Sequence, residues 1–268
     1  MSSEISLLAE MMKKASRIVF LGGAGVSTES GIPDFRSENG VFQATKEFGY
    51  PPEVLISHTF FMKRTAEFYR YYRKNLLYPD AKPNPAHAAL SKMEWGSASP
   101  EKNERPRGKL TAVITQNIDN LHQAAGSKNV LELHGSVYRN YCMKCRKYYS
   151  LNELIGKLDE AEDGIPRCSC GGIIKPDVVL YEEGLDQKTL IQSVHHIEQA
   201  DMMIIGGTSL MVYPAAGLCD YFRGNNLVVI NLSDTAKETG ASLAIHRPIG
   251  EVLREAVSML EEEELDRT

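Results

Sequence analysis

Continuous apolar runs alternate along the chain with longer segments in which apolar residues recur at helical spacing. The runs predict buried β-strands, and they lie at residues 17–21, 110–115, 130–133, 202–205 and 227–230. The helically spaced segments predict helices, and they lie at residues 7–14, 58–77, 87–93 and 251–260. Buried strands that alternate with helices are typical of a parallel sheet covered on both faces. We therefore expect an α/β fold with a doubly wound, Rossmann-like parallel sheet.

Other segments do not show this pattern so clearly. Residues 38–52 are mixed in composition, with glycines and paired prolines, which predicts a mobile loop beside a binding site. Residues 95–109 are polar and predict a surface loop. The acidic run at residues 261–264 predicts a solvated tail. The many aromatic residues at 58–77 are expected to pack a small helical subdomain; the alternative is that one or two of them line a substrate pocket.

A glycine-rich turn, Gly22-Gly23-Ala24-Gly25, follows the first predicted strand. Such a turn lets the backbone approach a ligand closely. Ser27, Thr28 and Glu29 suit the first turn of a following helix, whose N–H groups attract an anion. The dinucleotide fingerprint G-x-G-x-x-G is incomplete, because Thr28 stands at the third glycine position. The sequence therefore predicts a strand, a phosphate-binding turn and a helix, followed by a proline-stiffened loop that ends at Arg36.

Polar residues also follow the later strands. Residues 116–119 follow the second strand, His134 follows the third, and residues 206–209 and Asn231 follow the next two. Open α/β sheets bind ligands at the carboxyl ends of their strands, so these residues form one candidate site. Each also has a structural alternative: His134 could be an ordinary buried histidine, and residues 116–119 could merely cap a helix.

Four of the five cysteines form two close pairs, Cys142 with Cys145 and Cys168 with Cys170. Four thiolates at this spacing suit one tetrahedral Zn²⁺ in a small ribbon. The second pair is C-x-C, and the two glycines that follow it would relieve the tighter turn. Four protein ligands leave no position for water, so we expect a structural ion. The alternative is four ordinary reduced thiols, and Cys219 is expected to be a buried packing residue.

Composition narrows the class of protein further. Of the 268 residues, 43% are hydrophobic and 24% are charged, as in an ordinary soluble globular protein. The net charge of −5 argues against nucleic acid as a main partner. The N-terminus lacks the basic start and apolar run of a signal peptide, and no run approaches the roughly 20 apolar residues of a membrane span. We therefore expect a cytoplasmic protein with reduced cysteines and no membrane partner.

The segment from Leu21 to Arg36 closely resembles the cofactor-binding signature of the sirtuins, the NAD-dependent protein-lysine deacylases. Further sirtuin motifs follow in order, namely Gln116-Asn-Ile-Asp119, His134-Gly135, the cysteine pairs, Lys175-Pro-Asp-Val-Val179 and Gly207-Thr-Ser209. The resemblance implies an NAD-dependent protein-lysine deacetylase with one catalytic unit over residues 1–268. Its Rossmann-like large domain would comprise residues 1–37, 83–138 and 175–268. Its small domain would comprise a helical part, residues 38–82, and a zinc ribbon, residues 139–174.

The resemblance also implies roles for individual residues. Ala24, Ser27, Thr28 and Arg36 would hold the phosphates of NAD and their neighbouring groups. Gly23, Gly25 and Asp34 would also contact the cofactor. The adenosine half would contact Gly207, Thr208, Ser209 and Asn231. Nicotinamide would contact Ile32, Asn117, Ile118 and Asp119, while Phe35 would screen the sugar carbon from water and Gln116 would orient the ribose and His134. Val178, Val179 and Tyr181 would seat the acyl-lysine, whose peptide would lie as an added strand between residues 179–183 and 209–213.

The implied reaction transfers the acyl group to ADP-ribose and releases nicotinamide. The bond between ribose and nicotinamide breaks with oxocarbenium character, so the site must exclude water. The amide oxygen of acetyl-lysine attacks the sugar carbon, and His134 then accepts a proton from the ribose hydroxyl. Asn117 is the second catalytic residue that the resemblance implies. Zinc takes no chemical part.

Acetyl is the expected acyl group. Sirtuins that prefer succinyl or malonyl groups bind the acyl carboxylate with a tyrosine and an arginine three residues later. Here Tyr72 stands three residues after Tyr69, and Arg73 is one position further. Two other functions stay open: transfer of ADP-ribose to a protein side chain, and NAD binding by a zinc-ribbon module without catalysis. The presence of both His134 and Asn117 argues against the second.

Overall fold

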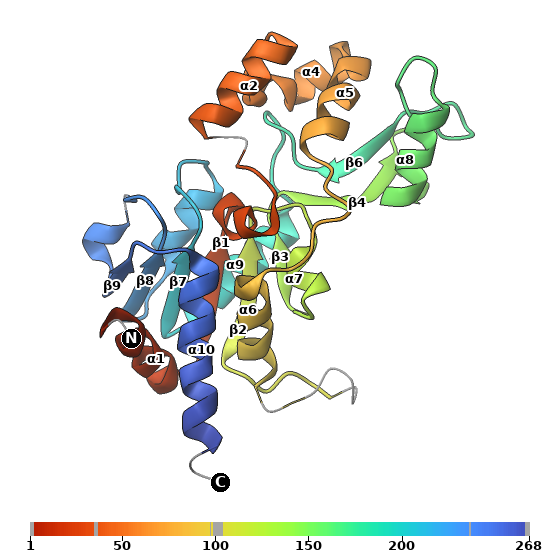
Figure 1. Ribbon diagram of the computed structural model, residues 1–268. Coiled ribbons are helices and arrows are strands. Elements are labelled where there is room, and N and C mark those ends of the chain that lie inside the picture. Colours follow the sequence, from red (N-terminus) through yellow and green to blue (C-terminus); the bar gives the residue numbers. More distant parts are fainter. Residues whose placement is uncertain (1–2, 35–36, 97, 99–103, 236, 266–268) are drawn as a thin grey trace.

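The computed structural model describes residues 3–34, 37–96, 98, 104–235 and 237–265. Its largest element is a six-stranded sheet with the order β3-β2-β1-β7-β8-β9, and every pairing in it is parallel (Figure 1). The strands are β1 (Ile18–Gly22), β2 (Leu110–Thr115), β3 (Val130–Glu132), β7 (Met202–Gly206), β8 (Asn226–Ile230) and β9 (Leu243–Ile245). The strand order reverses between β1 and β7, and a doubly wound sheet binds its ligands at such a point.

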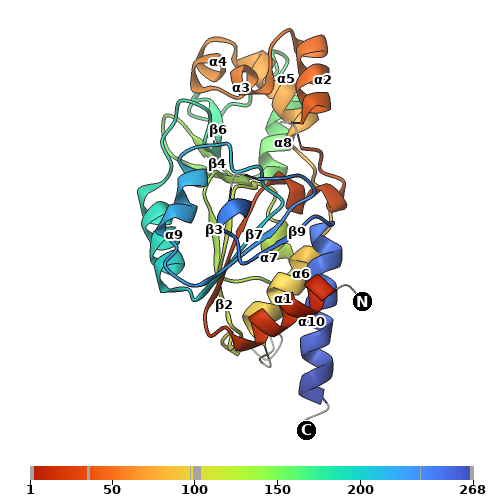
Figure 2. The same cartoon turned by 90° about the vertical axis from the view of Figure 1, so that its left-hand side faces the viewer.

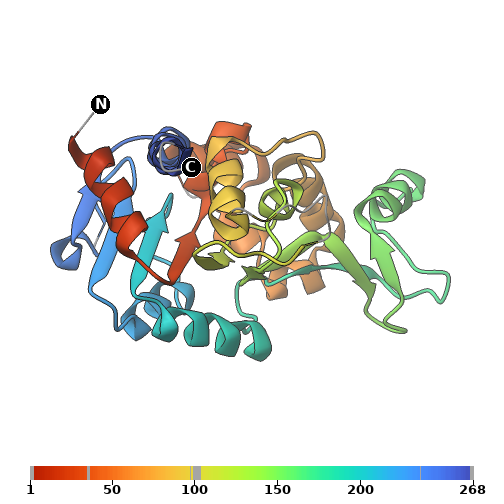
Figure 3. The ribbon, with the colours of Figure 1, turned by 90° about the horizontal axis from the view of Figure 1, so that it is seen from below.

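Helices cover both faces of this sheet (Figure 3). One face carries α1 (Ser3–Lys14), α6 (Pro85–Trp95) and α10 (Ile249–Leu265), and the other carries α9 (Gln187–Gln199) and a 3-10 helix at Ala215–Tyr221. Successive side chains of a strand point to opposite faces, so Ile18 and Phe20 of β1 pack in the first core, and Val19 and Leu21 pack in the second. The predicted doubly wound α/β fold is confirmed. Among the described helices, none is both long and apolar enough to cross a membrane.

A smaller assembly lies at one end of the large sheet (Figures 1 and 2). Its antiparallel sheet has the order β5-β4-β6 and contains β4 (Gly135–Cys142), β5 (Tyr148–Ser150) and β6 (Ile174–Val178), with α8 (Leu151–Glu160) beside it. Its helical module contains α2 (Glu38–Phe48), α3 (Pro52–Leu55), α4 (His58–Lys63) and α5 (Thr65–Asn75). Sheet and helices share one core, where the rings of Phe61, Phe68 and Tyr69 meet edge to face. The residue bounds of the two predicted domains stay a prediction.

Two segments that we expected to lack structure are helical. Residues 38–48 form α2, because the side chain of Ser37 caps its first turn and Gly49, at a φ of 80°, ends it. The small polar and glycine residues that predicted a mobile loop therefore bound a helix. The acidic run at residues 261–264 continues α10, which packs along α6, and does not form a tail. Of the predicted surface loop, residues 97 and 99–103 lie outside the described part of the chain.

Two histidines are buried together beside the large sheet. The rings of His87 in α6 and His122 in α7 (Leu121–Ala124) have centroids 4.7 Å apart. Nδ1 of His87 accepts a hydrogen bond from the backbone N–H of Asn84 at 3.2 Å, while both ring nitrogens of His122 lack a partner among the described residues. Burial lowers the pKa of His87 to about 4. Burial, together with the neighbouring His87, also lowers the pKa of His122.

Acid is expected to destabilise the fold through this pair. An unfolded histidine binds a proton near pH 6.5 but folded His87 does so only near pH 4, so in this window the unfolded state binds more protons. The free energy of unfolding should therefore fall by about 3 kcal/mol for His87 alone as the pH drops through the window. Urea titrations at pH 7 and pH 4 measure this loss. The His122→Gln variant should lose less unfolding free energy between pH 7 and pH 4 than the wild-type protein, whereas the control variant His195→Gln, at an exposed position, should lose as much. Equal losses in the wild-type protein and both variants would contradict the prediction.

Candidate active site

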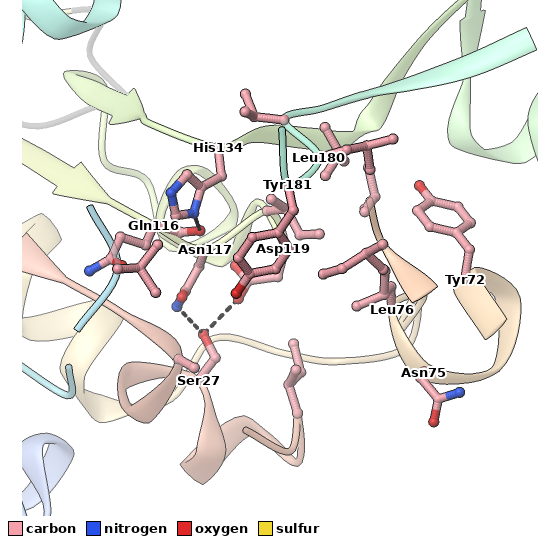
Figure 4. Close-up of a pocket in the computed structure, with 18 of the residues that line it drawn as sticks. Ser27, Tyr72, Asn75, Leu76, Gln116, Asn117, Asp119, His134, Leu180 and Tyr181 are labelled. Atoms are coloured by element: carbon pink, nitrogen blue, oxygen red, sulfur yellow. Dashed lines mark hydrogen bonds between the residues drawn. The ribbon is translucent and has the colours of Figure 1, made fainter. Parts of the chain in front are cut away.

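A cavity of about 200 Å³ lies where the carboxyl ends of β1, β2 and β3 meet the smaller assembly (Figure 4). Residues that follow the strands of the large sheet form its polar end. Side chains of α5, β4 and the segment after β6 form its more apolar end. The structure brings these predicted site residues to the cavity: Ala24, Ser27, Ile32, Gln116, Asn117, Ile118, Asp119, His134, Val178, Val179 and Tyr181.

Other predicted site residues do not line this cavity; they are Gly23, Gly25, Thr28, Asp34, Gly207, Thr208, Ser209 and Asn231. Phe35 and Arg36 lie outside the described residues. The sequence prediction did not place several lining residues, among them Tyr72, Asn75, Leu76, Val137 and Pro214. The aromatic richness of residues 58–77 is the one sequence signal for Tyr72. The other residues reach the cavity only through the tertiary fold: Asn75 and Leu76 through the placement of α5, Val137 through β4, and Pro214 through the segment after β7.

The glycine turn after β1 forms two short 3-10 turns, Ala24–Val26 and Thr28–Ser30, instead of the one longer helix that we expected. The helix prediction is wrong because Gly31, at a φ of 83°, ends the second turn and a proline follows two residues later. The contact of this turn with the phosphates of a cofactor stays a prediction. The glycines instead allow close backbone packing: the N–H of Gly25 donates to the carbonyl of Gly207 at 2.8 Å, and a Cβ on Gly25 would lie 2.8 Å from Cα of Gly207.

Ser27, Asn117 and Asp119 form a hydrogen-bonded cluster at the polar end of the cavity (Figure 4). The hydroxyl of Ser27 donates to Oδ2 of Asp119 at 2.6 Å and accepts from Nδ2 of Asn117 at 3.0 Å. Burial raises the pKa of Asp119, while the hydrogen bonds from Ser27 and from the backbone N–H of Leu121 oppose that shift. Because Ser27 is buried in this cluster, its hydroxyl is not available to cap a helix. The cluster offers carboxylate and amide groups that suit an amide ligand.

His134 is oriented by the backbone at the end of β2. Its Nδ1 lies 3.0 Å from the carbonyl oxygen of Gln116. Since a carbonyl oxygen only accepts hydrogen bonds, Nδ1 carries the proton, and Nε2 is the basic nitrogen of the neutral ring. The side chain of Gln116 in turn donates to the hydroxyl of Thr208 at 3.0 Å, which joins the ends of β2 and β7. This arrangement brings to the cavity an imidazole that is chemically suited to act as a general base.

The segment after β6 is held against the helical module. Tyr181 forms an isolated backbone bridge with Ser57, just before α4. The carboxylate of Glu182 accepts the backbone N–H of Thr59 at 2.8 Å, although Glu182 has a φ of 75°, in the region that favours glycine. These contacts fix the backbone that brings Leu180 and Tyr181 to the cavity.

The two cysteine pairs come together in the ribbon. Their four sulfur atoms lie within 4.8 Å of one another; the sulfurs of Cys142 and Cys170 are 3.5 Å apart, and those of Cys145 and Cys168 are 3.6 Å apart. Zn–S bonds of about 2.3 Å place tetrahedral ligands about 3.8 Å apart, so the cluster fits a zinc ion. Gly171 has a φ of 80°, and a Cβ on Gly172 would lie 2.7 Å from the sulfur of Cys142, so both glycines serve the tight C-x-C turn as predicted. The four residues that could hold the ion are Cys142, Cys145, Cys168 and Cys170.

Sequence comparison identifies relatives along nearly the whole chain. Residues 23–214 match the Sir2 family. The NAD-dependent protein deacetylase of Clostridium acetobutylicum is 53% identical over 255 residues, which cover 95% of this chain and 98% of that protein. The NAD-dependent protein deacetylase of Clostridium perfringens is 51% identical over 259 residues, which cover 96% of this chain and all of that protein.

Solved structures agree with these relatives. A Sir2 structure with deacetylated p53 peptide and 3'-O-acetyl ADP-ribose has a TM-score of 0.82 and 36% sequence identity, and the match covers 96% of this chain and 98% of that chain. A Sir2 structure with p53 peptide and NAD⁺ has a TM-score of 0.77 and 36% identity, over 97% of this chain and 99% of that chain. Sequence, fold and the arrangement of motifs therefore agree, and this chain belongs to the Sir2 family.

Proposed function

We infer that this chain is an NAD-dependent protein-lysine deacetylase, which transfers the acyl group from lysine to ADP-ribose and releases nicotinamide. The observation that carries the inference is a single cavity in which His134 lies beside the cluster of Ser27, Asn117 and Asp119 (Figure 4). Relatives named NAD-dependent protein deacetylases, at up to 53% identity, support the activity. Sir2 structures with NAD⁺ and with acetyl ADP-ribose support the cosubstrate and the product class.

The polar end of the cavity is proposed to hold the nicotinamide half of NAD. Asn117 and Asp119 present hydrogen-bonding groups there, and Ile32 and Ile118 supply apolar walls. When bound, NAD supplies the sugar carbon from which nicotinamide departs. Asp119, kept in place by Ser27, would accept a hydrogen bond from the carboxamide, and the buried walls would keep water from the reacting carbon.

His134 is proposed as the general base. Its Nδ1–H is fixed by the carbonyl of Gln116, so Nε2 would accept the proton of the ribose hydroxyl, which then attacks the acyl carbon. Val178, Val179 and Tyr181 would seat the acyl-lysine, because they line the same cavity from the segment after β6. The acyl-lysine peptide would lie as an added strand between residues 179–183 and 209–213. Two solved Sir2 structures, with an acetylated and a propionylated peptide, support a protein or peptide substrate.

The zinc ion is proposed to act on structure alone, since four cysteines leave it no open position for water or substrate. Cysteines that form no disulfide favour a reducing compartment, and we propose the cytoplasm. Fractionation of cells that express the chain would test this location.

Mass spectrometry of an acetyl-lysine peptide incubated with the protein tests the proposed function. Loss of the acetyl group should require NAD and should yield an acetylated ADP-ribose together with nicotinamide. Labelled NAD that left a stable adduct on protein, without deacetylation, would instead indicate ADP-ribosyl transfer.

Glu182→Ala is expected to raise the KM for the acyl-lysine peptide by about threefold to tenfold, with a smaller effect on kcat. The change removes the acceptor for the N–H of Thr59 but keeps a side chain at a φ of 75°. The Glu182→Gly variant loses the same hydrogen bond, but glycine adopts a positive φ without strain. It should therefore raise the KM less than the Glu182→Ala variant does. Steady-state kinetics with varied peptide separates KM from kcat. A KM that neither variant alters would show that this contact does not position the segment.

A further inference from the structure

The hydroxyl of Tyr72 is buried without a hydrogen-bond partner. Tyr72 lies in α5 with 0% of its side chain exposed, and its oxygen has no partner among the described residues. Most buried hydroxyl groups in folded proteins are hydrogen-bonded, because burial of an unmet polar group is unfavourable. Tyr69, one turn earlier, follows this rule, since its hydroxyl donates to the carbonyl of Ile174. The exception at Tyr72 therefore needs an explanation.

Tyr72 lines the cavity of the proposed active site. Figure 4 shows it across Leu76 and Leu180 from His134, with its hydroxyl pointing away from α5. Neighbouring rings fix this orientation: Tyr72 stacks on Phe68, with centroids 5.7 Å apart, and meets Tyr69 edge to face at 6.0 Å. The hydroxyl therefore cannot turn toward another partner without disturbing that packing. The oxygen has almost no accessible surface in this structure, so a group that enters the cavity can reach it only if neighbouring side chains shift slightly.

The surroundings select the chemistry of that group. Burial raises the pKa of Tyr72, so the hydroxyl stays protonated and can donate a hydrogen bond. No lysine or arginine occurs among the described residues that line the cavity, so a carboxylate placed there would lack a cationic partner. Leu76, Val137 and Leu151 are apolar neighbours along the same wall. The site therefore suits a chain that is mainly hydrocarbon and carries one neutral oxygen.

We propose that the hydroxyl of Tyr72 binds an oxygen atom on a neutral acyl chain longer than acetyl, so that hydroxyacyl- and oxoacyl-lysines are preferred over hydrocarbon acyl-lysines of equal length. The proposal rests on the deacylase activity inferred above and names its acyl class. The acyl carbonyl reacts near His134, and the rest of the chain passes Leu180 and Leu76 to reach Tyr72. Acetyl is too short to make this contact and remains a substrate without it.

Matched peptides test the preference. One lysine of one peptide carries acetyl, butyryl, 3-hydroxybutyryl, pentanoyl, 4-oxopentanoyl or succinyl, and kcat/KM is measured for each with saturating NAD. Butyryl is compared with 3-hydroxybutyryl, and pentanoyl with 4-oxopentanoyl. In at least one of these pairs, kcat/KM for the oxygenated acyl group should be about fivefold to tenfold higher than kcat/KM for the hydrocarbon group. Succinyl should react more slowly than butyryl. Tyr72→Phe removes only the hydroxyl and should bring the favoured ratio close to one, whereas Tyr71→Phe, on the same helix but away from the cavity, should preserve it.

The outcomes separate this inference from the proposed function. Failure to remove any acyl group, acetyl included, would overturn the deacylase activity. Removal of acetyl, with ratios near one for both pairs in the wild-type protein, would overturn the role of Tyr72 alone. Retention of the full preference by Tyr72→Phe would also overturn that role. Thermal melting of Tyr72→Phe and Tyr71→Phe shows whether each variant folds. If Tyr72→Phe does not fold, the kcat/KM ratios of the wild-type protein still test the preference for oxygenated acyl groups.

Discussion

Replacement of His134 with alanine is expected to lower kcat/KM for NAD-dependent deacetylation by about a hundredfold to ten-thousandfold, the range for loss of a general base. The backbone carbonyl of Gln116 holds the ring through Nδ1 at 3.0 Å, so Nε2 is the basic nitrogen of the neutral ring and would accept the proton. Alanine offers no atom that can take over this role. The loss should appear in product formation, which is measured as acetylated ADP-ribose per minute.

The order of the proposed steps makes the prediction sharper. The oxygen of acetyl-lysine attacks the sugar carbon, and nicotinamide leaves, before His134 accepts the proton of the ribose hydroxyl. The His134→Ala variant should therefore still release nicotinamide in a single turnover. Rapid quench with labelled NAD should therefore show nicotinamide release that depends on peptide, without matching acetylated product. Asn117→Ala, which alters the nicotinamide end of the cavity, should slow nicotinamide release itself. Full deacetylation by His134→Ala would show that another group is the base.

The ends of the strands explain why much of the candidate site could be predicted. The run Leu110–Thr115 is apolar and β-branched, and it forms β2 with the predicted bounds. In a parallel sheet, the residues that follow such strands meet at one edge, so a sequence that places Gln116 and His134 after strands also places them near each other. Buried runs and strand ends are local features, and local features can be read from sequence.

The incorrect predictions depend on contacts between distant segments. Ser27 looks like a helix cap in sequence, but its hydroxyl bonds to Asp119, and Gly31 ends the turn before a helix can form. For Tyr72, the sequence left two possibilities open, a packing ring or a residue that lines a pocket, and the structure shows that it lines the cavity. Its place on the cavity arises only when α5 packs on the ribbon and the segment after β6 passes in front of it, and periodicity carries no information about either contact.

Loss of zinc is expected to abolish deacetylation and to destabilise the smaller assembly by several kcal/mol, because metal binding in such ribbons is coupled to folding. The four cysteines do not line the cavity, but they lie where β4 ends and just before β6, and β6 leads directly into the residues that we propose seat the acyl-lysine. Cys142 is buried in this cluster, so Cys142→Ser should release the ion. Metal analysis by atomic emission should find about one zinc ion per wild-type chain and much less in the variant.

Cys219→Ala is the matched control, because Cys219 is buried in another core and burial raises its pKa to about 11, as expected of an inert thiol. It should keep zinc, fold and activity. If zinc only shapes the ribbon, Cys142→Ser should lose acyl-peptide binding and thermal stability together, and its loss of activity should follow its loss of folded protein. A variant that lost zinc, kept its fold and peptide affinity, and yet had no activity would point instead to a chemical role for the ion. That result is incompatible with a closed site of four thiolates.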